Sequence, residues 1–186
     1  MRLLSRAVLL VIATAILGSC SGSKRNVALE TNYGTIIIKL YDDAAPLHSA
    51  NFRKLVSKGF YNGLQFHRIV PGFVIQGGDP NSRGTNKSTY GEGGPGYTIP
   101  AEIGKPHLRG SVGMAREGDE VNPQRQSNGS QFYICVRDLP RLDGKYTIFG
   151  EVVRGMDVVD RIDSLKRDER DIPVSPVYIV KAYLVK

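Results

Sequence analysis

The sequence has few of the residues that most often carry covalent, redox or metal chemistry. In 186 residues it has no tryptophan, three histidines and two cysteines, Cys20 and Cys135. His48 and His107 show no metal-ligand spacing, and no convincing set of nucleophile, general base and orienting group is present. We therefore expect no metal site and no cofactor.

Near the N-terminus the sequence has only a short hydrophobic run. Eleven residues, Ala7–Leu17, follow Arg2 and Arg6, whereas a bilayer-spanning helix needs roughly 20. A basic start, a short apolar run and small residues after it are typical of a secretory signal. We predict that residues 1–19 are a signal peptide, with a retained membrane helix as the less favoured alternative.

The residues "LGSC", which end at Cys20, resemble the lipobox of bacterial lipoproteins. The resemblance implies that Cys20 becomes the lipidated first residue, that residues 20–26 form a tether, and that the exported protein is anchored in the cell envelope on the periplasmic side. Ser21, in place of the aspartate associated with inner-membrane retention, favours the outer membrane. An incidental cysteine near an ordinary cleavage site is the alternative.

If Cys20 is lipidated, Cys135 has no partner, so the domain must be stable without an intrachain disulfide.

Neither sign of charge is concentrated in blocks. The formal net charge of +7 falls to +5 when Arg2 and Arg6 leave with the signal peptide. Nucleic-acid binding favours a concentrated basic stripe, whereas the basic residues here are dispersed along the chain. We therefore expect no nucleic-acid partner and only a mild attraction to anionic envelope surfaces.

Residues 27–186 are expected to form one mainly β domain. A hydrophobic content of 41% suits a single core, while 21 glycines and 10 prolines, scattered along the chain, indicate many turns. The segment "TNYG" between two apolar runs predicts a hairpin, and the spacing of apolar residues predicts helices within 42–59 and 155–166. Further strands are predicted at residues 64–70, 73–77, 110–115, 130–137, 147–153 and 178–185.

The number and spacing of these strands favour an antiparallel sheet closed into a barrel. Closure removes exposed sheet edges, and the two helices would cap the ends of the barrel. Two irregular stretches, residues 79–100 and 116–128, have the length of functional loops. The first begins at the end of "FVIQGGD" and the second precedes "GSQFYI", so we expect both loops to frame any site formed by these segments.

The run "FHRIVPGFVIQGGD" alternates like two strands but includes Arg68 and Gln76. An isolated arginine in a strand is usually a solvated or salt-bridged surface residue. Strand alternation sends the neighbouring His67 to the opposite face, so we expect His67 to be structural.

Four segments occur in an order that resembles the cyclophilin family of peptidyl-prolyl cis/trans isomerases. They are "FHRIVPGFVIQGGD", "GSVGMA", "NGSQFYI" and "LDGKYTIFGEVVRGMDVVDRI", and the likeness runs from about residue 27 to residue 185. The resemblance implies an eight-stranded antiparallel β-barrel capped by two helices. It also implies an enzyme that acts on proline-containing unfolded or extended polypeptides.

The resemblance assigns roles position by position. Arg68 falls where the family has its catalytic arginine, Phe73 where a phenylalanine lines the proline pocket, and Gln76 where a glutamine bonds the substrate backbone and helps to hold the arginine. The substrate-binding positions implied in the same way are Val74, Ala115, Arg116, Gln131, Tyr133, Leu142 and Tyr146.

The chemistry of the X-Pro bond suits these residue types. Rotation about this tertiary amide has a barrier of roughly 18 to 20 kcal/mol, and the uncatalysed step takes tens of seconds or longer. Twisting the bond returns the lone pair to nitrogen, so a donor aimed at that nitrogen binds the twisted state better than either planar state. Arg68 is always charged and is a suitable donor. An apolar box of Phe73, Val74, Tyr133 and Leu142 can grip the proline ring.

Three positions depart from the commonest family pattern. Arg116 stands where many members have an asparagine, and Tyr146 where many have a histidine. Arg141 occupies the place where cyclosporin-sensitive members often have tryptophan. We therefore predict weak cyclosporin binding.

Two functions are consistent with these residues. The first is a peptidyl-prolyl isomerase that speeds the folding of exported proteins. The second is a non-catalytic module that holds proline-containing segments as a chaperone or scaffold. The joint presence of Arg68, Phe73 and Gln76 favours the enzyme, because binding alone does not require a donor at the prolyl nitrogen. A monomer is the default expectation.

Overall fold

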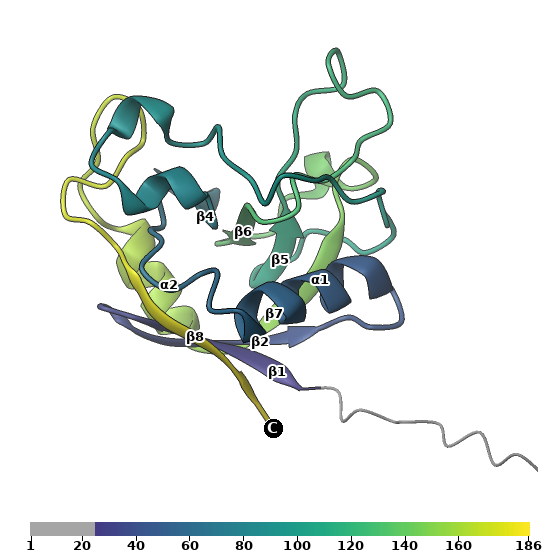
Figure 1. The fold of residues 1–186 in the computed structure, drawn as a ribbon, viewed down its shortest axis with the longest axis horizontal. Helices are drawn as coiled ribbons and strands as arrows, with labels where there is room; N and C mark the ends of the chain where they lie inside the picture. The colour runs from purple at the N-terminus through teal and green to yellow at the C-terminus, as the bar shows by residue number, and fades with distance from the viewer. Residues whose placement is uncertain (1–24) are drawn as a thin grey trace, which may run out of the picture.

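The computed structural model describes residues 25–186 (Figure 1). The predicted signal peptide, Cys20 and all of the predicted tether before Arg25 lie outside the described residues. The first strand begins at Asn26, one residue before the predicted start of the domain. Within residues 25–186, no helix combines the length and apolar character needed to cross a membrane.

Eight strands form a single antiparallel sheet, and each predicted strand is present. Their bounds are β1 Asn26–Thr31, β2 Gly34–Leu40, β3 Arg68–Val70, β4 Val74–Gly77, β5 Ser111–Met114, β6 Phe132–Cys135, β7 Ile148–Arg154 and β8 Ile179–Val185. The hydrogen-bonded order is β3-β4-β6-β5-β7-β2-β1-β8. The predicted hairpin joins β1 to β2, where Gly34 has a φ of 131°, a conformation that glycine adopts without steric cost.

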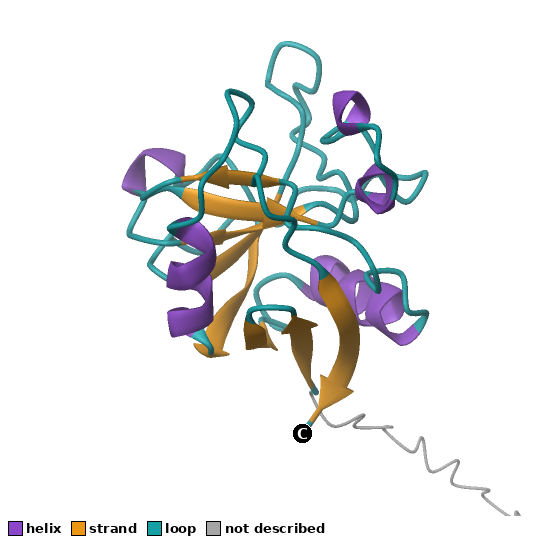
Figure 2. Cartoon of the chain, turned by 90° about the vertical axis from the view of Figure 1, so that its left-hand side faces the viewer, coloured by secondary structure: helices purple, strands orange, loops and turns teal. Residues whose placement is uncertain are grey.

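The sheet curls but stays open, so the prediction of a closed barrel is wrong (Figure 2). Strands β3 and β8 end the order and share no ladder. Near them, residues 63–66 and 177–179 meet only through isolated backbone hydrogen bonds, such as the one from Phe66 N to Val177 O at 2.9 Å. Strand β3 is only three residues long, and the Pro176 carbonyl accepts instead from Asn32 Nδ2 at 3.1 Å. A regular ladder therefore does not form across this gap.

Both predicted helices are present. Helix α1, Pro46–Ser57, begins with a proline in its first turn, where the missing N–H costs no hydrogen bond, and packs on β7 and β8. Helix α2, Met156–Asp163, packs on β2, β3 and β4. Each helix buries one apolar face, as the spacing of Phe52 and Leu55 in α1 and of Val158 and Ile162 in α2 predicted.

Strand alternation divides the buried side chains between two clusters. In β6, Phe132 and Ile134 join the main core inside the curl, whereas Tyr133 and Cys135 belong to a smaller cluster on the other face. The short 3-10 helix η3, Pro140–Leu142, adds Leu142 to this second cluster. A small apolar surface is thus built on the outer face of the sheet.

The two long stretches predicted as loops lie beside that outer cluster. Residues 79–100 contain two short 3-10 helices, η1 Pro80–Arg83 and η2 Lys87–Thr89, whereas residues 116–128 form the projecting loop at the top of Figure 1. The two stretches are tied together by paired backbone hydrogen bonds between Ile99 and Ser127, at 3.0 and 2.8 Å.

Candidate functional site

A cavity of about 170 Å³ opens on the outer face of the sheet. Strands β3, β4 and β6, the turn between β3 and β4, helix η3 and the loops after β5 and η3 contribute its lining residues, which are Arg68, Phe73, Val74, Gln76, Ala115, Arg116, Tyr133, Leu142 and Tyr146. The structure thus brings together every predicted site position in residues 25–186 except Gln131, which lies directly behind Gln76.

One edge of the cavity is a chain of polar side chains. The register of β3 and β4 pairs Arg68 with Gln76, and the Arg68 guanidinium donates to Gln76 Oε1 at 3.2 Å. Gln76 Nε2 donates to Gln131 Oε1 at 2.9 Å, and Gln131 Nε2 donates to the carbonyl oxygens of Gly91 and Gly93 at 2.8 and 2.7 Å. Because those carbonyls can only accept, they fix the orientation of both amides. The guanidinium is therefore held by an acceptor that cannot turn away.

The opposite side of the cavity is an aromatic and aliphatic wall. Val74 and Tyr133 are almost fully buried, and Phe73 and Leu142 pack against them. The Tyr133 ring lies directly over Gly113, where an added Cβ would be 2.3 Å from the ring. Only glycine at this position leaves room for the tyrosine.

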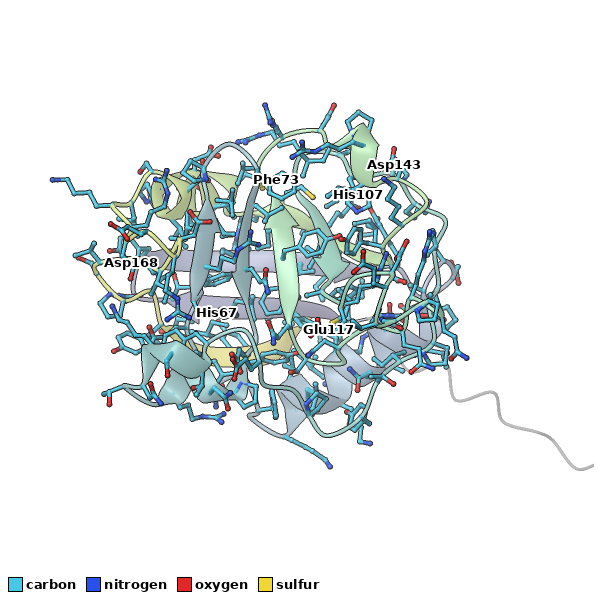
Figure 3. All side chains as sticks on the ribbon, turned by 90° about the horizontal axis from the view of Figure 1, so that it is seen from above. His67, Phe73, His107, Glu117, Asp143 and Asp168 are labelled. Atoms are coloured by element: carbon cyan, nitrogen blue, oxygen red, sulfur yellow. The ribbon has the colours of Figure 1, made fainter. Side chains whose placement is uncertain are left out.

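Tyr133 is hydrogen-bonded to His107, which is in turn bonded to Asp143; sequence reasoning missed both of these residues. The buried His107 ring has Nε2 at 2.9 Å from the Tyr133 hydroxyl and Nδ1 at 2.8 Å from Asp143 Oδ1. Burial lowers the pKa of His107, although Asp143 partly opposes the shift, and burial raises the pKa of Tyr133. Figure 3 shows His107 and Asp143 close together near Phe73. Beside Tyr133, burial raises the pKa of the free Cys135 thiol to about 12.

Arg116 and Tyr146 form a second rim of the cavity. The Arg116 side chain is only 4% exposed, donates from Nε to Lys145 O at 2.9 Å and pairs with Asp119 at 2.7 Å. Its guanidinium carbon lies 4.6 Å from the centre of the Tyr146 ring. The guanidinium therefore ties the loop of residues 116–128 to the segment that carries Tyr146.

Arg141 covers the wall from outside. Its guanidinium carbon lies 5.0 Å from the centre of the Phe73 ring, a cation–π distance. Within residues 25–186, Arg141 makes no ion pair with a carboxylate. A charged group thus stands at the rim of the cavity next to Phe73.

His67 is buried but does not line the cavity. Its side chain has no hydrogen-bond partner at either ring nitrogen, and burial lowers its pKa, with Asp79 opposing the shift. Figure 3 places it apart from Phe73, His107 and Asp143. The arrangement fits a structural residue beside Arg68.

A second hollow of about 340 Å³ adjoins the first and shares Gln76, Ala115 and Arg116 with it. The two long loops supply much of the remaining lining, including Thr98 and Val121. This placement agrees with the expectation that the loops frame the site. In the described part of the chain, no three His, Cys, Asp or Glu side chains are grouped so as to hold a metal ion.

Chemically, the cavity pairs one fixed guanidinium with an apolar box. It offers a hydrogen-bond donor of permanent charge next to walls that exclude water, where such a donor acts more strongly than in bulk solvent. It suits a small ring attached to a polar group whose charge changes during reaction.

A family model described as "Cyclophilin type peptidyl-prolyl cis-trans isomerase/CLD" matches residues 26–184. A peptidyl-prolyl cis-trans isomerase of Synechococcus elongatus is 47% identical over 147 residues, which cover 74% of this chain and 92% of that protein. The peptidyl-prolyl cis-trans isomerase ppi1 of Schizosaccharomyces pombe is 41% identical over 158 residues, which cover 84% of this chain and 97% of that protein.

Solved structures show the same likeness. A crystal structure of a cyclophilin type peptidyl-prolyl cis-trans isomerase from Cryptosporidium parvum has 30% sequence identity and a TM-score of 0.77, covering 87% of this chain and 98% of that one. A second structure of that protein, in the presence of the dipeptide Ala-Pro, has the same TM-score and identity and is covered to 99%.

Proposed function

The chain belongs to the cyclophilin-type peptidyl-prolyl cis-trans isomerases and is such an enzyme. On this premise we propose that Arg68 supplies the catalytic hydrogen bond, that Gln76 positions Arg68, and that the wall around Phe73 holds the proline ring of the substrate.

The hydrogen-bonded chain from Arg68 to Gln131 carries this proposal. When the X-Pro bond twists, the nitrogen becomes pyramidal and regains its lone pair, which then accepts a hydrogen bond that the planar amide cannot accept. The N–H groups of Arg68 not used by Gln76 are the donors available for that bond. Because Gln76 is itself fixed by Gln131, the guanidinium needs little reorganisation when the substrate twists.

The wall gives the proline ring an apolar seat. Phe73, Val74, Tyr133 and Leu142 hold the ring while the carbonyl side of the bond turns. Binding of proline-containing unfolded or extended polypeptides is supported by the Cryptosporidium parvum structure obtained in the presence of Ala-Pro. No nucleophile or proton transfer is required, because the reaction makes and breaks no σ bond.

An isomerisation assay on a short X-Pro peptide tests the assignment, either by NMR exchange or by coupling to a protease. Arg68→Ala is expected to lower kcat/KM by about 100-fold or more, as is typical when a transition-state donor is removed. Arg154→Ala, at the exposed end of β7, is the matched control and is expected to leave the rate unchanged. An unchanged rate in Arg68→Ala, with peptide binding retained, would favour the non-catalytic binding module.

The N-terminal segment supports a proposal for where the enzyme acts. The "LGSC" segment supports lipidation of Cys20 after removal of residues 1–19, which would hold a monomeric domain at the periplasmic face of the envelope, in the outer membrane, where exported chains fold. Mass spectrometry of the mature N-terminus should find an acylated Cys20, and Cys20→Ser should release the protein from membranes. An unmodified cysteine, or a chain that still carries residues 1–19, would contradict this.

Weak cyclosporin binding is proposed on the basis of Arg141. The exposed guanidinium stacked on Phe73 places a charge where an apolar macrocycle would require an apolar neighbour. Cyclosporin should inhibit Arg141→Trp more tightly than the parent enzyme in an inhibition titration. Tight inhibition of the parent would refute the proposal.

A further inference from the structure

Asp143, His107 and Tyr133 form a continuous hydrogen-bonded chain from solvent to the cavity. The Asp143 side chain is 39% exposed, whereas the His107 side chain is fully buried. The two links measure 2.8 Å, from Asp143 Oδ1 to His107 Nδ1, and 2.9 Å, from His107 Nε2 to the Tyr133 hydroxyl. Tyr133 in turn lines the cavity.

The chemistry of the three groups gives this chain a direction. Asp143 Oδ1 also accepts from the His107 backbone N–H at 2.8 Å, and an ionised carboxylate can only accept. Hydrogen bonds from His107 lower the pKa of Asp143, and burial lowers the pKa of His107, so near pH 7 the carboxylate is charged and the ring is neutral. The ring proton therefore lies on Nδ1, Nε2 accepts, and the Tyr133 hydroxyl donates to it.

His107 also contacts other parts of the cavity lining. Its ring lies nearly parallel to the Tyr133 ring, with an interplanar angle of 7°, and edge-on to Tyr146 with centroids 6.2 Å apart. Asp143 directly follows Leu142 in the chain. The buried His107 ring thus packs against two lining residues, Tyr133 and Tyr146, and is hydrogen-bonded to the chain neighbour of a third, Leu142.

We propose that His107, fixed by Asp143, is a positioning residue for isomerisation, because it holds the Tyr133 hydroxyl and so keeps the wall of the proline pocket in place. The inference rests on the proposed function of that pocket. His107 itself is not among the residues that line the cavity.

A specific pH dependence follows. Protonation of His107 turns Nε2 from an acceptor into a donor, so the Tyr133 hydroxyl must rotate its proton toward the apolar pocket. The ionisable groups around the ring are Asp143, Tyr133 and Tyr146, with Arg116 stacked on Tyr146 and Cys135 beside Tyr133. The proposed mechanism transfers no proton, so KM should be constant near neutral pH and rise only in acid, below the ordinary histidine pKa of about 6.5.

Ring-nitrogen NMR tests the geometry in the unmodified enzyme without using turnover. The chain has three histidines, so signals lost in His107→Gln identify the ring. We expect the Nδ1–H tautomer for His107, with titration only at a pH clearly below 6.5. An Nε2–H tautomer, or titration at the ordinary value, would overturn the proposal.

A double-mutant cycle tests the coupling to catalysis. His107→Gln and Tyr133→Phe should each raise KM about 3- to 10-fold, as expected for one lost hydrogen bond, with kcat less affected. In the Tyr133→Phe background, His107→Gln should add nothing and the acid rise in KM should disappear. Fully additive effects, or an acid rise that survives Tyr133→Phe, would contradict a role through the hydroxyl.

His48→Gln is the matched control. His48 is equally buried and has two partners, Glu102 Oε2 at 2.6 Å and Ser127 Oγ at 2.8 Å, but it does not line the cavity. It should lower Tm as His107→Gln does while leaving KM unchanged. An equal rise in KM would mean that His107 acts only through stability.

Because Arg68→Ala reports on kcat and the NMR test does not depend on turnover, failure of the proposed function can be distinguished from failure of this inference.

Discussion

The two sides of the proposed proline pocket are built differently. On the polar edge, Arg68, Gln76 and Gln131 form a single file in which each side chain depends on the next. On the wall, Phe73 and Tyr133 belong to a cluster in which each side chain has several apolar neighbours. In a linear series of hydrogen bonds, loss of one side chain frees those that it holds in place. In a cluster, loss of one side chain leaves the others packed against each other. We therefore expect changes on the edge to act on kcat and changes in the wall to act on KM.

The largest expected effect comes from Arg68→Lys. Lysine keeps the charge but loses the planar fork that can donate to Gln76 and to the substrate at once. We expect kcat to fall by about 100-fold with KM changed little, since one transition-state donor is lost. Steady-state kinetics on an X-Pro peptide measure both. If the loss appeared mainly in KM, the division of labour between edge and wall would be wrong.

Phe73→Ala is expected to act next, on the other side. Removing the ring takes away part of the apolar seat and the surface on which Arg141 stacks. The lost burial should raise KM about 10-fold while kcat stays within a factor of about 3. Phe73→Leu keeps most of the apolar volume and is the control that should recover most of the binding. A large fall in kcat would show that the wall also shapes the twisted state.

Gln131→Met should have a smaller catalytic effect, and it tests whether the polar edge depends on its last side chain. Methionine has a similar shape, but Gln76 Nε2 loses its acceptor and the carbonyls of Gly91 and Gly93 lose their donor. Arg68 itself keeps its partner, so we expect kcat to fall about 3- to 10-fold, the effect of one hydrogen bond. An unchanged kcat would mean that Gln76 is held without Gln131, so the side chains of the polar edge would not depend on one another in series.

The smallest effect concerns stability and pH. Burial lowers the pKa of His48, His67 and His107, so the unfolded chain binds more protons than the folded chain once the pH falls below about 6.5. The free energy of unfolding is therefore fully retained above that pH and declines below it. Calorimetry should show Tm lower by about 2 to 4 °C at pH 5.5 than at pH 7.5. A Tm that rises in acid would contradict the burial of these rings.

The polar edge could be predicted from the sequence because its parts are close along the chain. Arg68 and Gln76 are eight residues apart, and a tight β3–β4 hairpin pairs them directly. The strand pattern and the helices were predictable for the same reason, since periodicity is a local signal. The resemblance to the family extended this to Tyr133 and Leu142.

The rest depended on packing that no local pattern encodes. His107 and Asp143 are 36 residues apart and meet only in the folded chain, where Asp143 directly follows η3. The one available signal was a tyrosine hydroxyl in an apolar strand, which requires a buried partner. The open sheet was mispredicted because closure requires a regular hydrogen-bond ladder between β3 and β8, which the number of strands does not determine.

The thiol of Cys135 can serve as a chemical probe for transient opening of the wall. It is the only cysteine among residues 25–186, it is fully buried in the same cluster as Tyr133, and its raised pKa keeps it protonated and unreactive. A thiol reagent can modify it only during moments when the wall opens. In a Cys20→Ser chain, the rate at which Cys135 is labelled would therefore report the opening equilibrium of the wall. The rate can be compared with and without a bound proline peptide.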